Sequence, residues 1–173
     1  MINKLTFSPA FAALAIVGAL EAQAPSVRQI AQERAQAELD APKLAEVLEL
    51  KPGMTVADIG AGGAAAPTNL PAACCDAIFL RHVYHHITDI ELFNRSLHTS
   101  LKAGGRLAII DFRATHRLAG AGRCARESRG HGIAPSVVIS EVSAPGLTHL
   151  ETIDKWPVGD KDPSYFLVLF RKP

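Results

Sequence analysis

Residues 54–63, Met-Thr-Val-Ala-Asp-Ile-Gly-Ala-Gly-Gly, decide the fold class of this chain. The first six are mostly apolar or β-branched, which is typical of a buried strand. The glycines after them let the backbone adopt positive φ and approach a ligand closely. Their spacing differs from the G-x-G-x-x-G fingerprint of dinucleotide-binding turns, because the third glycine is not in its place. The stretch therefore predicts a buried strand that ends in a ligand-binding turn.

Strands and helices alternate along the rest of the chain. Apolar, β-branched runs predict further strands, the first two of them buried, at residues 76–80, 106–112, 147–153 and 164–170. Periodic apolar residues predict helices at residues 26–39, 89–101 and 134–146, and another that Asp40 caps. Lys102 to Gly105 is predicted to stop the helix at residues 89–101. This alternation predicts an α/β fold with about five strands, mostly parallel.

The composition excludes several classes of protein. The chain has 173 residues, a net charge of +1, 48% hydrophobic residues and 20% charged residues. A disordered chain would be poorer in apolar residues and would carry a larger net charge. The balanced charge gives no overall attraction to nucleic acid, and no nucleic-acid partner is expected. The length fits one ordinary domain.

The first 24 residues resemble a secretory signal peptide. Lys4 precedes an apolar run at residues 7–20 and the small-residue pattern Ala22-Gln-Ala24. The run is short for a membrane span, which needs about 20 residues. Pro25 would hinder cleavage after Ala24. Three alternatives stay open: cleavage after Ala22, retention of the segment as an anchor, and a buried N-terminal helix. The favoured interpretation is a signal at 1–24, a domain at 25–173 and a periplasmic or secreted product, with membrane contact only if the signal is retained.

Three cysteines, Cys74, Cys75 and Cys124, leave at least one thiol unpaired in any monomer. A ring that joins the adjacent Cys74 and Cys75 is strained, and a bond from either one to Cys124 is the alternative in an oxidising compartment. Buried, inert thiols beside a strand are the favoured interpretation.

Residues 113–129 contain five arginines and one acid, Glu127. A solvated loop is the favoured interpretation. The alternative is a basic flap over an acidic or phosphorylated ligand.

Residues 81–86, Arg-His-Val-Tyr-His-His, follow the predicted strand at residues 76–80. They therefore lie at the carboxyl end of that strand, where ligands of α/β sheets bind. Tyr84, His85 or His82 is a candidate for positioning a substrate or accepting a proton. Hydrogen bonding within the loop is the competing interpretation, and a metal site is disfavoured because no acid or cysteine motif accompanies the histidines.

Three motifs together resemble the class I S-adenosylmethionine-dependent methyltransferases. Residues 50–63 resemble motif I, and residues 69–80, with Leu-Pro before Asp76, resemble the fourth-strand motif. Residues 101–112, Leu-Lys-Ala-Gly-Gly-Arg-Leu-Ala-Ile-Ile-Asp-Phe, are similar to the turn and fifth strand of the family. The histidine segment is most similar to an exported bacterial branch. The resemblance implies a Rossmann-like methyltransferase sheet with an antiparallel member among its last two strands.

The resemblance also implies a cofactor and its site. Methyl transfer from S-adenosylmethionine to an unknown small-molecule acceptor is expected, with no metal. The implied cofactor-binding residues are Asp58, Gly60, Ala61, Gly62, Gly63, Asp76 and Leu80. The implied catalytic candidates are Tyr84, His85 and His82.

The chain departs from the family between Gly63 and Asp76. A family member has a second and a third strand here, and an acid at the end of the second strand binds the cofactor ribose. No carboxylate lies between Asp58 and Asp76 in this chain. We expect a truncated sheet, a coil connection, and an edge strand at residues 56–59 that invites pairing with a second copy as a homodimer. An impaired enzyme, a non-catalytic remnant that acts as a binding or oligomerising module, and a deletion without a stable product all stay open.

Overall fold

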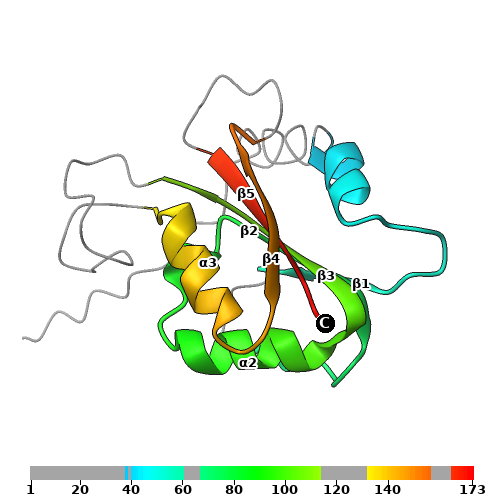
Figure 1. Cartoon of the computed structure of the whole chain (residues 1–173). Coiled ribbons are helices and arrows are strands. Elements are labelled where there is room, and N and C mark those ends of the chain that lie inside the picture. The colour runs from blue at the N-terminus through cyan, green and yellow to red at the C-terminus, as the bar shows by residue number, and fades with distance from the viewer. Residues whose placement is uncertain (1–37, 39, 61–66, 114–131, 157–164) are drawn as a thin grey trace, which may run out of the picture.

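The computed structural model describes residues 38, 40–60, 67–113, 132–156 and 165–173. Five strands form one sheet in the order β1-β2-β3-β5-β4 (Figure 1). The elements are β1 (Val56–Ile59), β2 (Cys75–Arg81), the 3-10 turn η1 (Tyr84–His86), α2 (Ile90–Ser100), β3 (Leu101–Phe112), α3 (Pro135–Ser143), β4 (Thr148–Asp154) and β5 (Tyr165–Arg171). The expected α/β sheet of five strands is confirmed.

The sheet is mixed, with one strand reversed relative to the other four. β1, β2 and β3 are parallel to one another, whereas β5 runs antiparallel to both of its neighbours, β3 and β4. The antiparallel member expected among the last two strands is therefore present. Because β5 reverses direction, its first residue lies at the same edge of the sheet as the last residues of β1, β2 and β3.

Helices cover both faces of the sheet. α2 and α3 lie on one side of it, and the helix that contains residues 40–47 lies on the other (Figure 1). Alternate residues of the central strands divide between two buried clusters: Ile78 belongs to the α2–α3 side, and Ala77 belongs to the side of Leu44 and Leu48. The period of two along each strand produces this division.

Two predicted helix boundaries have different outcomes. Asp89 caps α2 as expected, since its Oδ1 accepts a hydrogen bond of 3.1 Å from the backbone N–H of Leu92. Asp40 does not cap its helix, because residue 38 is already helical. Its carboxylate instead pairs with Arg81 at the end of β2, 2.5 Å from Nη2.

The helix ends just before Lys102, as predicted, since α2 ends at Ser100 with Leu101 as its C-cap, but Lys102 to Gly105 belong to β3 and form no separate turn. The register between β2 and β3 shifts in this segment, which absorbs the extra residues. A side chain at Gly105 would lie 2.9 Å from the carbonyl oxygen of Lys102 and 3.0 Å from that of Asp76. The glycine is therefore needed for the close approach of the two strands.

β1 is an edge strand, as expected, but the prediction that it is buried is wrong. Its residues alternate between exposed and half-buried, and Val56 is 39% exposed. Within the described part of the chain only β2 pairs with β1. Residues 67–74, which lead into β2, form bends and turns without a helix, in agreement with the expected coil connection.

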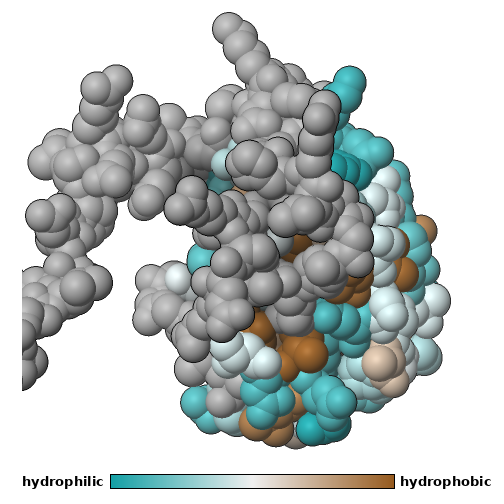
Figure 2. All heavy atoms as spheres, turned by 90° about the vertical axis from the view of Figure 1, so that its left-hand side faces the viewer, coloured by the Kyte–Doolittle hydropathy of each residue, from teal (hydrophilic) through white to brown (hydrophobic). Residues whose placement is uncertain are grey.

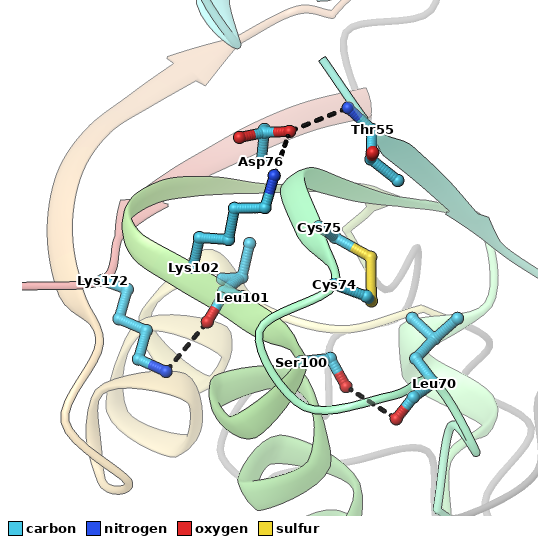
Figure 3. The surroundings of a disulfide bond; sticks show 9 residues. All are labelled: Thr55, Leu70, Cys74, Cys75, Asp76, Ser100, Leu101, Lys102 and Lys172. Carbon is cyan, nitrogen blue, oxygen red and sulfur yellow. Dashed lines mark hydrogen bonds and ion pairs between the residues drawn. A yellow bond between two sulfur atoms is a disulfide. The ribbon is translucent and has the colours of Figure 1, made fainter. Parts of the chain in front are cut away.

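The structure joins Cys74 to Cys75 by a disulfide bond just before and at the start of β2 (Figure 3). The expectation of inert free thiols is therefore wrong for this pair, and Cys124 lies outside the described residues. Nearby, the carboxylate of Asp76 accepts hydrogen bonds from the Thr55 backbone and from Lys102 Nζ, each 2.8 Å long (Figure 3). The bond from Lys102 is the main cause that lowers the pKa of Asp76.

The predicted signal segment, the helix at residues 26–39 and most of the arginine-rich stretch lie outside the described residues. None of the helices that the structure describes is long and apolar enough to cross a bilayer. On the visible face that Figure 2 shows, hydrophobic residues occur in patches among hydrophilic ones.

Candidate functional site

The carboxyl edge of the sheet brings together the predicted functional segments. We use this name for the edge at which β1, β2 and β3 end and β5 begins. Ile59 pairs with Leu80 and Arg81 pairs with Ile110, so the segments after β1 and β2 leave the sheet side by side. Phe112 at the end of β3 pairs with Tyr165 at the start of β5.

Asp58 lies in β1, one residue before the end of the strand. Its side chain is on the same side of the sheet as Phe79, its partner in β2. Although the residue is exposed, neighbouring protein removes part of the solvation of the carboxyl group and raises its pKa, while the charge of Arg81 opposes that shift. Asp40 and Asp58 thus place two carboxyl groups around the Arg81 guanidinium.

Gly60 makes the turn after β1 possible. Its φ is +119°, and a Cβ atom at this position would lie 2.6 Å from Cγ1 of Val83. The loop after β2 therefore packs directly on the backbone of the turn. Of the other predicted turn residues, Ala61, Gly62 and Gly63 lie outside the described residues.

Replacing Gly60 by alanine is expected to lower the free energy of unfolding by about 2–4 kcal/mol, through backbone strain and the clash with Val83. Urea unfolding of the variant measures the loss. Adding Val83→Ala should recover part of it, because the clashing methyl groups are removed. Equal losses in the single variant and in the double variant would contradict the contact.

His85 and Asp111 form a buried pair at this edge. His85 Nδ1 lies 2.8 Å from Asp111 Oδ1, and the backbone N–H of His85 donates to Oδ2 at 3.1 Å. The side chains are 1% and 0% exposed. Because a carboxylate only accepts hydrogen bonds, Nδ1 carries the proton in this pair, and the lone pair of a neutral ring is on Nε2.

Tyr84 does not lie in the site as predicted. It is fully buried between α2 and α3, where its hydroxyl accepts from Asn94 Nδ2 at 2.9 Å and donates to Glu141 Oε2 at 3.1 Å. These contacts join the two helices. The structure therefore supports a packing role for Tyr84 and not a catalytic one.

His82 lies at the edge in an unusual backbone conformation, with φ of +54°. Its backbone N–H donates to the carbonyl oxygen of Ile110 at 2.9 Å. Burial, and then the charge of Arg81, lower the pKa of His82 to about 4. The ring is therefore neutral at neutral pH.

The remaining two predicted cofactor residues lie at opposite ends of β2. Leu80 is at the carboxyl edge, where its side chain is fully buried in the core. Asp76 is at the amino end, roughly 13 Å away at about 3.3 Å per residue. Its bonds to Thr55 and Lys102 give it a structural role at the end of β2 opposite the carboxyl edge, so the structure does not bring it together with the other predicted cofactor residues.

Sequence analysis missed Asp111 and the pair of Asp40 and Arg81. The sequence does contain a signal for Asp111, because this carboxylate lies inside the apolar run at residues 107–112. No sequence signal indicates the contact between Asp40 and Arg81, because the contact depends on how a helix packs on a distant strand. Among the described residues, no three histidine, cysteine, aspartate or glutamate side chains gather as metal ligands.

The mixed sheet, its glycine turn and the polar carboxyl edge define an α/β fold of the kind that binds ligands at the ends of parallel strands. A family model described as "Methyltransferase domain" matches residues 22–109, which is about half of the chain. The chain belongs to this methyltransferase family, as its motifs predict. A search of the curated proteins found no match.

Solved structures with the same fold include several methyltransferases. A SAM-dependent methyltransferase from Aquifex aeolicus is 18% identical, with a TM-score of 0.60 over 80% of this chain and 93% of that one. One from Mesorhizobium loti is 16% identical, with a TM-score of 0.57 over 78% and 98%. The 1,6-didemethyltoxoflavin-N1-methyltransferase from Burkholderia thailandensis is 17% identical, with a TM-score of 0.60 over 84% and 81%. At these identities the likeness establishes the fold.

Proposed function

We propose that this chain transfers a methyl group from S-adenosylmethionine to a small-molecule acceptor at the carboxyl edge. The observation that carries the proposal is the placement, in a member of the methyltransferase family, of the Gly60 turn and the His85–Asp111 pair at one edge. The Gly60 turn follows β1 and Asp111 lies in β3, two strand spacings or roughly 10 Å apart, with the loop after β2 between them.

Asp58 and the turn at Gly60 fit the cationic, methionine-bearing part of this cofactor. The carboxyl group of Asp58 is exposed, and the turn at Gly60 begins two residues later. We propose that Ala61, Gly62 and Gly63 continue this cradle and that Leu80 forms part of its floor. When bound, the cofactor supplies an electrophilic methyl group. The chain aligns the acceptor with that group and excludes water.

His85 is the group that accepts a proton from the acceptor in this proposal. Asp111 is a positioning residue, since its bonds to Nδ1 and to the backbone N–H fix the ring of His85. His82 contributes to the binding of the acceptor. Tyr84 holds the two helices beneath the site and touches no reactant.

We further propose that the sheet lacks the second and third strands of the family and that the protein is of the exported branch. The short link from Gly63 to Asp76 and the edge position of β1 support the first point. A homodimer paired along β1 would cover the open edge, and analytical sedimentation measures the oligomeric state.

Residues 1–24 support a periplasmic or secreted product, which N-terminal sequencing of the exported protein tests.

Calorimetric titration of the folded chain with S-adenosylmethionine tests the function. We expect binding about two to four decades weaker than that of an intact relative. In this proposal the chain lacks two charge-assisted hydrogen bonds to the cofactor ribose, and it also lacks the wall that holds the adenine. Together these losses reduce the binding free energy by about 3–5 kcal/mol. Micromolar binding by a monomer would contradict the importance of the missing strands. An absence of binding at millimolar cofactor would favour the alternative, a non-catalytic remnant that binds or oligomerises through β1.

A further inference from the structure

Three aromatic side chains gather at the carboxyl edge beside His85. His82 follows β2, Phe112 ends β3 and Tyr165 begins β5. The ring centroid of His82 lies 4.8 Å from that of Tyr165 and 6.1 Å from that of Phe112, and the other two centroids are 5.9 Å apart. All three residues are half-buried, so part of each stays accessible. We call these three residues the aromatic cluster.

The aromatic cluster carries no net charge at neutral pH. Burial and the charge of Arg81 keep the imidazole of His82 neutral, with a pKa of about 4. A neutral imidazole stacks on another aromatic ring but gives no charge that would hold an anion. The chemistry of the cluster therefore favours a flat, uncharged ring.

Among the described residues, the two arginines at this edge already have partners. Arg81 pairs with Asp40, and Arg113 pairs with Asp154 at 2.6 Å. A phosphate or carboxylate group on a ligand would have to compete with these carboxylates. The described surroundings of the cluster thus favour an uncharged ligand over an acidic one.

The backbone at His82 holds its ring in place. The positive φ is unfavourable for a residue with a side chain, and strain of this kind often marks a functional position. The hydrogen bond from His82 N–H to Ile110 fixes the backbone, and the ring lies at 31° to that of Tyr165. The strained conformation therefore keeps the two rings close to stacking.

We propose that the aromatic cluster binds the methyl acceptor and that this acceptor is a planar aromatic compound with an ionisable hydroxyl group. The proposal rests on methyl transfer at the same edge. The ring centroid of His85 lies 4.8 Å from that of Phe112, which brings the proton acceptor beside the cluster. The hydroxyl proton passes to Nε2 of His85 and its oxygen bonds to the methyl carbon. The bond from that carbon to sulfur breaks, and its electron pair stays on sulfur.

Saturation-transfer NMR on the full chain tests the proposal, with catechol as the aromatic probe and cyclohexane-1,2-diol as its non-aromatic counterpart. We expect catechol to bind and the diol to bind at least about tenfold more weakly, because it cannot stack. His82→Asn removes a ring but keeps a residue that tolerates positive φ, and Tyr165→Leu removes the second ring. Each should weaken catechol binding by about three- to tenfold. Tyr165→Phe keeps the ring and should retain more of the affinity than Tyr165→Leu.

Equal binding of the two probes, or unchanged catechol binding in both ring-removal variants, would overturn the proposal. If either variant fails to fold, Phe112→Leu takes its place. Calorimetry with S-adenosylmethionine separates this proposal from the proposed function. Cluster-dependent catechol binding without cofactor binding would keep the aromatic site and reject the enzyme. Cofactor binding with methyl transfer only to non-aromatic acceptors would keep the enzyme and reject the aromatic site.

Discussion

Replacing His85 by asparagine is expected to lower the rate of methyl transfer by about 10²- to 10⁴-fold while the protein stays folded. The asparagine amide can donate to Asp111 in place of Nδ1, but it provides no basic nitrogen at the position of Nε2. The rate constant at saturating cofactor measures the effect. An asparagine variant with unchanged activity would show that His85 is not the proton acceptor.

His85→Leu is the matched variant that also removes the hydrogen bond. Asp111 is fully buried, so the loss of its partner should cost about 3–5 kcal/mol of unfolding free energy. Urea unfolding should therefore separate the two variants clearly. Equal stability of the asparagine and leucine variants would show that the pair contributes little to folding.

Replacing Asp58 by alanine is expected to remove about 2–5 kcal/mol of cofactor binding free energy. The carboxyl group lies beside the glycine turn, where it faces the cationic part of S-adenosylmethionine in the proposed site. Calorimetric titration of the folded variant measures the loss. Unchanged affinity would refute the assignment of Asp58 to the cofactor.

Asp76→Ala is the control for this experiment. Asp76 is the other acid flanking the shortened link, but it lies at the amino end of β2 with Thr55 and Lys102. Its removal should therefore leave cofactor affinity unchanged. A loss of affinity as large as that of Asp58→Ala would show that the placement of the site at the carboxyl edge is wrong.

Local sequence determined most of the secondary structure. Apolar runs placed the strands within a residue or two, except that β3 begins at Leu101, five residues before the predicted run, and Asp89 placed the start of α2. The glycine at position 60 predicted the turn, because a residue without a side chain adopts positive φ readily. The edge position of β1 followed from the short link to β2.

The roles of the polar residues depended on tertiary structure. Tyr84 and His85 are neighbours in the sequence, yet one joins two helices and the other meets Asp111 at the carboxyl edge. Asp76 stands at the start of a parallel strand, so strand direction separates it from the site. The partner of His85 comes from β3, and that of Arg81 comes from the helix that contains residues 40–47. A sequence pattern records the local preference of the backbone, whereas these contacts arise only when distant segments pack against one another.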